Sequence, residues 1–357
     1  MKKLEDYLTY EQPTKYIIVN DNYSNEYDVP VLTAGKSFIL GYTNEKENVF
    51  PKEKLPVIIF DDFTTDCKYV DFPFKVKSSA MKILHPINNA NAKFLYYYMK
   101  KIKFDNTLHK RYWISEYSKL PIKELNDTEQ NNFIKKMEKL EVLINTRNKQ
   151  IENCNMLIKS QFVEMFGTNK KSKYVFDSLN NLTLKITDGK HGGCNGDNNS
   201  GFYFVGATEI YNNKINYQTA KEITKNDFEK DYKRCDLKNN DFVIVNTGAT
   251  IGKSAVVNSN VTDHTLLQKS VALIRTKDDV LNPLYLKYCY EINPDMYNKG
   301  NGCARINLLL SQIKETMIPV PPIELQNKFA DIVKQIDKQK FSNMNILELL
   351  VKIVVLW

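Results

Sequence analysis

The chain has 357 residues, of which 42% are hydrophobic and 26% charged, an ordinary composition for a globular protein of two or three domains. No apolar run approaches the ~20 residues of a membrane-spanning helix. The six dispersed cysteines lack a Cys-x-x-Cys pair, which argues against a disulfide framework and a zinc cluster and favours a cytoplasmic location. The net charge of +8 is compatible with a polyanionic partner but specifies none.

An internal repeat organises the sequence. In the first copy, Val57–Phe60 and Ser79–Leu84 predict strands, and Asn91–Met99 predicts an aromatic-rich helix opened by an asparagine. The second copy repeats these patterns at a nearly constant offset in Val243–Asn246, Ser270–Arg275 and Asn282–Tyr290, and two further matches join Leu120–Ile122 to Ile318–Val320 and Gln130–Phe133 to Gln326–Phe329. Each half therefore predicts a β-rich region, a short aromatic helix, a proline-marked exit and a long helix.

Both long helices have apolar residues at alternating spacings of four and three, which is typical of a coiled-coil seam. In the first, the seam residues are Phe133, Met137, Leu140, Ile144, Ile151, Cys154 and Ile158, with Arg147 as a polar interruption. In the second, they are Leu325, Phe329, Ile332, Ile336, Ile346, Leu350 and Ile353, with polar Gln339 and Asn343. We expect the two helices to pair, and two ordinary amphipathic core helices are the alternative.

The expected helix starts define four segments. Asn126 or Asp127 with Glu129 or Gln130 can cap the first long helix, and Pro322 can start the second. We expect β-rich domains over residues 1–125 and 168–322, a central helix over 126–167 and a C-terminal helix over 323–357. At ~1.5 Å per residue the first helix would be roughly 60 Å long, long enough to measure a distance along duplex DNA.

The turn in Ile244–Val257, IVNTGATIGKSAVV, is similar to a phosphate-binding loop but fails two requirements. Gly248 and Gly252 enclose one residue too few, and the sequence that follows predicts a strand where the phosphate site needs a helix N-terminus. We therefore expect a strand–turn–strand that presents Thr247, Thr250 and Lys253. A nucleotide-dependent enzyme built on Gly248–Ser254 is the alternative.

Motifs along the chain occur in the order found in type I restriction-modification specificity subunits, which this sequence resembles. They are Ile186–His191, Phe204–Ile210, Asp241–Val245, Gly248–Lys253, Gln268–Ile274 and Ile318–Gln326, with Leu157–Gly167 similar to the family's end-of-spacer signature. The first half is similar to another class of the same domain through Tyr10–Pro13, Ile59–Thr65 and Phe74–Ser79. Two features depart from the family pattern: the C-terminal helix lacks a second end-of-spacer signature, and Gly192–Gly196 follows the first motif.

The resemblance implies an α+β fold with two β-rich target-recognition domains separated by two long antiparallel helices, a coiled-coil spacer, in a pseudo-twofold internal repeat. Each domain would read one half-site of double-stranded DNA. Two methyltransferase subunits would dock on the helices and methylate adenine with S-adenosylmethionine, and up to two restriction subunits would use ATP and Mg. No cofactor is expected on this chain.

The residues themselves predict binding without catalysis. Val320–Ile323 contains the only Pro-Pro pair but lacks the flanking groups of an adenine methyltransferase loop, and Asp61 and Asp62 lack the partners of a nuclease site. The four histidines, at 85, 109, 191 and 264, do not form a metal-ligand cluster. We therefore expect no catalytic and no metal-binding residues. Asp61 is expected to cap a turn or to accept a hydrogen bond from cytosine N4. An assembly scaffold with inactive recognition domains is a further alternative.

Loops beside tight glycine turns can bring lysine, threonine and asparagine close to DNA. Each such lysine could equally be an ordinary solvated charge. Tyr96, Tyr97, Tyr98, Tyr288 and Tyr290 lie on repeated helices, so we expect them to pack in the interior and not to stack on bases. The expected DNA contacts are Lys36, Thr64, Thr65, Lys68, Lys110, Arg111 and Tyr112 in the first domain, and Lys190, His191, Thr247, Thr250, Lys253, Asn301 and Arg305 in the second.

Overall fold

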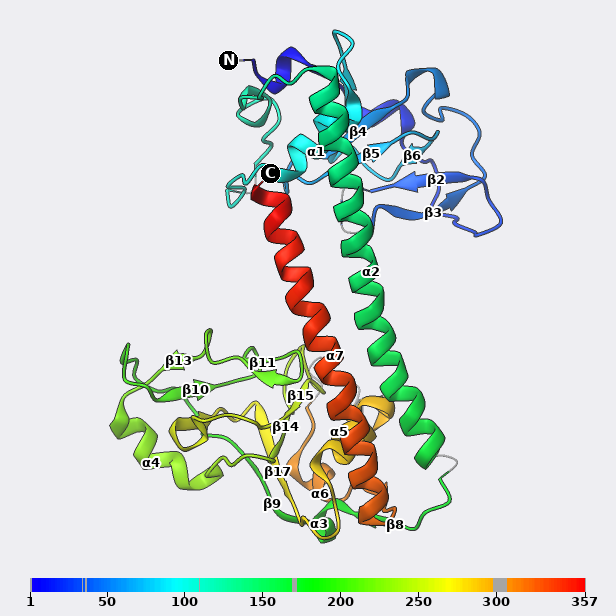
Figure 1. Ribbon diagram of the computed structural model, residues 1–357. Coiled ribbons are helices and arrows are strands. Elements are labelled where there is room, and N and C mark those ends of the chain that lie inside the picture. The colour runs from blue at the N-terminus through cyan, green and yellow to red at the C-terminus, as the bar shows by residue number, and fades with distance from the viewer. Residues whose placement is uncertain are drawn as a thin grey trace. The chain divides into compact units, whose positions relative to one another are not determined.

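A computed structural model describes residues 2–33, 35, 37–108, 110–168, 172–297 and 307–356. The chain divides into two compact units, the first made of Met1–Lys149 with Asn343–Trp357 and the second of Gln150–Ser342. Two long helices, α2 (Asp127–Phe166) and α7 (Ile323–Leu356), each contribute to both units (Figure 1). We describe each unit separately.

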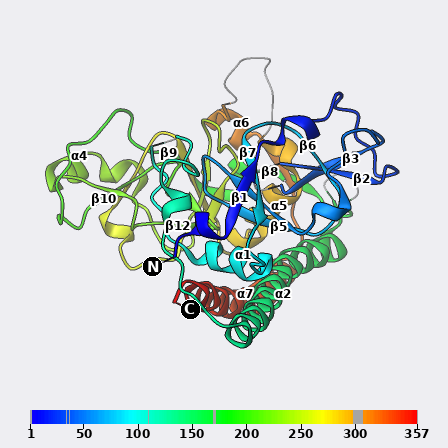
Figure 2. The same ribbon diagram turned by 90° about the horizontal axis from the view of Figure 1, so that it is seen from above.

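The first unit is built on a four-stranded antiparallel sheet in the order β1 (Leu8–Glu11), β7 (Met81–Pro86), β4 (Val57–Asp61) and β5 (Cys67–Val70). A second sheet has the order β3 (Ile39–Thr43), β2 (Val29–Leu32) and β6 (Lys75–Val76), in which β2 and β6 are parallel. Helix α1 (Ala92–Lys101) lies between the first sheet and α2 (Figure 2). Short 3-10 helices occupy Leu4–Asp6, Pro13–Tyr16, Lys52–Lys54 and Tyr117–Lys119.

The second unit contains a four-stranded antiparallel sheet in the order β9 (Thr183–Asp188), β17 (Val271–Thr276), β14 (Phe242–Val245) and β15 (Ser254–Val256). A second sheet has the order β13 (Lys221–Glu222), β10 (Tyr203–Val205) and β16 (Thr265–Leu267), with β10 and β16 parallel. The remaining elements are β8 (Phe176–Ser178), α3 (Leu179–Leu182), β11 (Ile210–Tyr211), β12 (Lys214–Ile215), α4 (Lys225–Cys235), α5 (Pro283–Ile292), α6 (Leu310–Lys314), β18 (Met317–Pro319) and 3-10 helices at Thr262–His264 and Pro294–Met296.

The central strands are buried on both faces, which explains their continuous apolar runs. Side chains alternate between the two faces of a strand. In β14, Phe242 and Ile244 therefore join a core with α5, α2 and α7, while Val243 and Val245 join the core beneath β10 and β16. In β4, Ile58 and Phe60 pack with α1, whereas Val57 and Ile59 face the second sheet.

The predicted internal repeat is confirmed by the strand order. The order β1–β7–β4–β5 in the first unit matches β9–β17–β14–β15 in the second, and β3–β2–β6 matches β13–β10–β16, including the parallel pair in each. Asn91 caps α1 by accepting from the backbone N–H groups of Lys93 and Phe94, and Asn282 caps α5 by accepting from Leu284. The same topology is therefore built twice.

The expected pairing of the two long helices is confirmed within each unit. In the first, Arg147 Nη1 donates to Asn343 Oδ1 at 3.0 Å, and Val354 packs against the cluster that contains Met137. In the second, the ring centroids of Phe162 and Phe166 lie 5.4 and 5.5 Å from that of Phe329. Rising numbers in α2 meet falling numbers in α7, so the helices are antiparallel (Figures 1 and 2).

One part of the predicted seam is wrong. In α7, Gln339 is exposed and Val333 is fully buried, so the seam passes through Phe329, Val333, Ile336 and Asn343. Gln339 therefore does not belong to the seam, because spacings of four and three can be phased in two ways when polar residues interrupt the pattern. Ile332 is half-buried and packs against the same core as Phe329, as predicted. The start of α2 is as expected: Asn126 Oδ1 accepts from Glu129 N at 3.0 Å, and the Glu129 carboxylate accepts from Asn126 N at 2.9 Å.

Two structural features are absent from the described part of the chain. None of its helices is long and apolar enough to cross a membrane. Nor do three His, Cys, Asp or Glu side chains of these residues come together where they could hold a metal ion.

Candidate nucleic-acid interface

The glycine-containing turn is a hairpin loop between β14 and β15. Val245 N donates to Lys253 O at 2.8 Å and Gly252 N donates to Val245 O at 2.9 Å, which closes the loop. Gly248 and Gly252 have φ values of 103° and 88°, and a Cβ on Gly252 would lie 2.4 Å from the ring of Tyr297. The expected strand–turn–strand is confirmed. Since β15 and not a helix follows the turn, the nucleotide-binding alternative lacks its helix N-terminus.

Hydrogen bonds bring two other segments beside this hairpin. Asn246 N donates to Ser270 O at 3.0 Å, and Leu308 N donates to Asn246 O at 2.8 Å. The Thr247 hydroxyl donates to Asn307 Oδ1 at 2.8 Å. The hairpin is thus joined on one side to the turn that leads into β17 and on the other to residue 307.

The loop after β9 joins the same edge. Lys190 N donates to Leu267 O at 2.7 Å, and Lys269 N donates to Lys190 O at 3.0 Å. This approach requires Gly189, since a Cβ there would lie 2.1 Å from the Leu267 carbonyl oxygen. We call residues 189–191, 246–253, 268–270 and 307 the second loop edge. It brings together the predicted contacts Lys190, His191, Thr247, Thr250 and Lys253.

Two of the predicted basic DNA contacts lie beside carboxylates of the protein itself. Lys190 forms an ion pair with Asp231 of α4, and the hydrogen bond from this pair raises the pKa of the lysine. His191 Nε2 lies 3.2 Å from Asp188, whose carboxylate also pairs with Arg234. A phosphate that approached these groups would compete with protein carboxylates. Lys253 and Lys269 are exposed, and among the described residues no carboxylate or other hydrogen-bond acceptor contacts their ammonium groups. The Lys253 ammonium lies 5.9 Å from the ring centroid of Tyr211.

Sequence reasoning missed Gln268, Lys269 and Arg234, which lie on or beside the second loop edge. Gln268 and Lys269 belong to a motif used above only to support the resemblance. Because they directly follow the apolar strand Thr265–Leu267, the sequence could have predicted that they lie in a loop at the end of that strand. Arg234 gave no signal, because 46 residues separate it from the Asp188 that it contacts.

In the first unit, the β4–β5 hairpin is the counterpart of the β14–β15 hairpin. The Asp61 carboxylate accepts from Phe63 N at 2.9 Å and from Thr64 N at 3.1 Å, as expected for a capped turn. Asp62 O accepts from Tyr112 N at 2.9 Å, just as Asn246 O accepts from Leu308 N in the second unit. Residues 110–113 therefore lie beside this hairpin. We call residues 61–66 and 110–113 the first loop edge.

A buried ion pair supports the first loop edge. Asp62 Oδ1 accepts from Trp113 N at 2.9 Å, and its Oδ2 lies 3.5 Å from Lys82 Nζ. The two side chains are only 4% and 3% exposed. Lys82 Nζ also lies 4.9 Å from the ring centroid of Tyr10.

The predicted contacts of the first unit differ in accessibility. Thr64 and Arg111 are exposed, Thr65 is half-buried, and Lys68 and Lys110 pair with Asp66 and Glu116. Tyr112 is a correction, because its side chain is fully buried and its hydroxyl accepts from Leu108 N at 3.0 Å, which leaves no surface for DNA. The predicted contacts Lys36, Asn301 and Arg305, with His109, lie outside the described residues.

The tyrosines of α1 and α5 pack as expected. Tyr96, Tyr97, Tyr288 and Tyr290 are buried, and Tyr97 donates to Glu141 of α2 at 2.9 Å. Burial raises the pKa of each of these phenols. Tyr96, Tyr97 and Tyr288 contact the long helices, whereas Tyr290 stacks on Phe242 of β14. These four buried rings present no stacking surface for bases.

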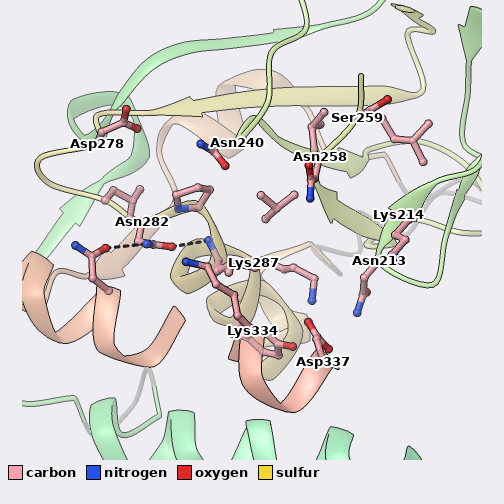
Figure 3. A pocket seen from close by; sticks show the side chains of 18 of the residues that line it. Asn213, Lys214, Asn240, Asn258, Ser259, Asp278, Asn282, Lys287, Lys334 and Asp337 are labelled. Atoms are coloured by element: carbon pink, nitrogen blue, oxygen red, sulfur yellow. Dashed lines mark hydrogen bonds between the residues drawn. The ribbon is translucent and has the colours of Figure 1, made fainter. Parts of the chain in front are cut away.

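A separate cavity of about 820 Å³ lies in the second unit (Figure 3). Its lining includes Lys214, Asn258, Asn282, Lys287 and Asp337, and none of the predicted DNA contacts. Lys287 is buried where α5 meets α7, which lowers its pKa, and it pairs with Glu291.

Comparisons of sequence place the chain near one group of proteins. Residues 193–350 match the family described as the type I restriction modification DNA specificity domain. A stretch of 119 residues, 32% of this chain, is 53% identical to the type I restriction enzyme EcoR124I/EcoR124II specificity subunit of Escherichia coli. That alignment spans 30% of the Escherichia coli protein.

Comparisons of structure cover nearly the whole chain. The crystal structure of a type I restriction-modification system S subunit from M. genitalium matches 99% of this chain and 93% of its own, with a TM-score of 0.55 and 14% identity. A structure that describes complex assembly and conformational transition of a type I restriction-modification system matches 99% of this chain and 95% of its own, with a TM-score of 0.52 and 14% identity. At this identity the likeness establishes a shared fold.

Proposed function

We propose, for a chain that belongs to the type I restriction-modification specificity subunit family, that it reads a two-part sequence in double-stranded DNA. One observation carries this proposal: a single strand topology is built twice, and in each copy the equivalent hairpin lies beside a second loop with exposed polar and basic residues. Phosphate contacts from lysine and arginine would supply most of the affinity, and side chains that reach base edges would supply sequence.

We assign the two reading functions to residues 1–125 and 168–322. The helical segments 126–167 and 323–357 would set the gap between the half-sites. The structure supports this assignment through the cores of the two units, each of which packs a four-stranded sheet against a short aromatic helix and parts of both long helices. A fixed gap then follows from the fixed length of α2.

We assign no reaction to this chain, and we propose that partner subunits perform the chemistry. Two methyltransferase subunits with S-adenosylmethionine would bind the long helices, and two restriction subunits with ATP and Mg would join where they are present, all in the cytoplasm. Both helices expose large apolar side chains, including Val142 at 65%, Met156 at 58%, Phe341 at 55% and Leu349 at 59%. Such side chains on a helix surface favour contact with another protein.

The test is co-expression of the chain with the methyltransferase encoded beside it, followed by single-molecule mapping of methylated adenines. We expect one motif of two short half-sites with a constant unread gap. Replacement of residues 168–322 by another recognition domain should change only one half-site. Methylation without sequence preference would instead support the scaffold alternative, and a change in both half-sites would refute the modular assignment.

A further inference from the structure

Gln268, which follows β16, is held in place from three sides. Its backbone N–H donates to Val205 O at 2.8 Å and its carbonyl accepts from Val271 N at 2.9 Å. Its side chain lies against Gly206, where a Cβ would be 2.4 Å from Oε1 and 3.1 Å from Cδ. Ser270 Oγ donates to Oε1 at 3.4 Å. An alanine at position 206 would displace this amide from its observed position.

The donor half of the same amide is unused. Nε2 of half-buried Gln268 has no hydrogen-bond partner among the described residues. Among the described residues this nitrogen is not one of the buried unpaired polar atoms, so it is open to solvent and free to donate to a ligand that accepts a hydrogen bond. Lys269, the next residue, is exposed, and Lys190, which pairs with Asp231, is bridged to Gln268 through the backbone. The Glu209 carboxylate accepts from Gly206 N at 2.8 Å and so lies beside the same glycine as the amide.

The first unit has the same backbone with different side chains at this position. Lys77 N donates to Leu32 O at 3.0 Å, as Gln268 N donates to Val205 O. Lys77 forms an ion pair with Asp21, and Thr33 follows Leu32 where Gly206 follows Val205. The repeat therefore preserves the scaffold and changes the groups at its tip, which is what two different half-sites require.

We propose that Gln268, seated against Gly206, reads an adenine in the half-site of the second unit, and that Lys269 binds a neighbouring phosphate. The carboxamide of glutamine matches adenine in the major groove, because Nε2 can donate to N7 while Oε1 accepts from N6. The weak bond from Ser270 leaves one lone pair of Oε1 free. This inference rests on the proposed function, and it further requires that the two half-sites differ in sequence.

The test uses the full chain co-expressed with its methyltransferase, with adenine methylation and DNA affinity measured on sites altered at one base pair at a time. Gln268→Ala should reduce discrimination at a single A·T pair of the second half-site by roughly 5- to 150-fold and leave the first half-site unchanged. Gly206→Ala should reduce discrimination at the same pair. Lys269→Ala should weaken binding to all sequences and reduce the salt dependence by about one phosphate contact.

Two further variants separate base reading from loss of structure. Gln268→Glu keeps the shape of the side chain and should move the preference from adenine towards cytosine, because a carboxylate accepts from cytosine N4. Gln218→Ala, at an exposed glutamine of the same unit outside the second loop edge, should change nothing. Equal weakening on every sequence by Gln268→Ala would overturn the inference. A wild-type protein without sequence preference would instead overturn the proposed function.

Discussion

The buried Asp62–Lys82 pair gives a prediction that can be worked through quantitatively. Lys82→Met keeps the length of the side chain and removes its charge, which leaves the Asp62 carboxylate buried without a counter-ion. The two side chains are 4% and 3% exposed and 3.5 Å apart, so water cannot replace the missing ammonium. Removing one partner of a buried ion pair lowers the free energy of unfolding by about 3–5 kcal/mol. With a urea m-value of about 2 kcal/mol/M, the unfolding midpoint should fall by roughly 1.5–2.5 M.

The fluorescence of Trp113 provides the assay. The chain has two tryptophans, and Trp113 is 2% exposed with its ring centroid 5.1 Å from that of Phe60. In a Trp357→Phe background, its fluorescence reports unfolding of the first unit. Asp62→Asn combined with Lys82→Met should recover most of the loss, because an amide oxygen still accepts from Trp113 N and no buried charge remains.

Lys110→Met is the matched control for this experiment. It breaks an ion pair of the same unit at the surface, where water and salt screen the charge, and it should leave the midpoint nearly unchanged. If Lys82→Met shifts the midpoint no more than Lys110→Met does, the buried pair does not support the first loop edge and the reasoning fails.

Three further outcomes are expected. Gly252→Ala should lower the free energy of unfolding by about 1–3 kcal/mol, because of its positive φ and the Tyr297 ring, whereas Gly193→Ala, with open space around it, should not. Burial lowers the pKa of His85, so the unfolded chain binds the proton at a higher pH than the folded chain does. The free energy of unfolding should therefore fall as the pH drops below about 6.5. In unfolding titrations at several pH values, His85→Gln should remove this part of the pH dependence. Insertion of four residues beside Arg147 should lengthen the unread gap of the methylated motif by about two base pairs, since it adds ~6 Å of helix; an unchanged gap would refute the role of the helices as a spacer.

The features that local sequence determines were predictable. Asn91 and Asn282 open equivalent helices because an asparagine side chain can accept from the backbone N–H groups of the first turn. The hairpin after β14 follows from two glycines between apolar runs. Asn126 and Glu129 form the capping box that their spacing predicts.

The features that depend on distant contacts were not predictable. Lys190 looks like a free cation in the sequence, but Asp231, 41 residues away, pairs with it. Tyr112 looks like part of a basic loop, but its ring is buried against Phe104, with ring centroids 5.1 Å apart. The role inferred for Gln268 depends on Gly206, which becomes its neighbour only when β16 pairs with β10.

The repeated scaffold is compatible with the proposed reading of two different half-sites by one chain. Equivalent tip positions are fixed by backbone hydrogen bonds, from Lys77 to Leu32 in the first unit and from Gln268 to Val205 in the second. Such bonds do not depend on the identity of the side chain at the tip. A substitution there changes the groups presented to DNA and leaves the strands that carry them intact. The buried strand residues are constrained by packing on both faces, so sequence preference can change at the loop edges while the fold is retained.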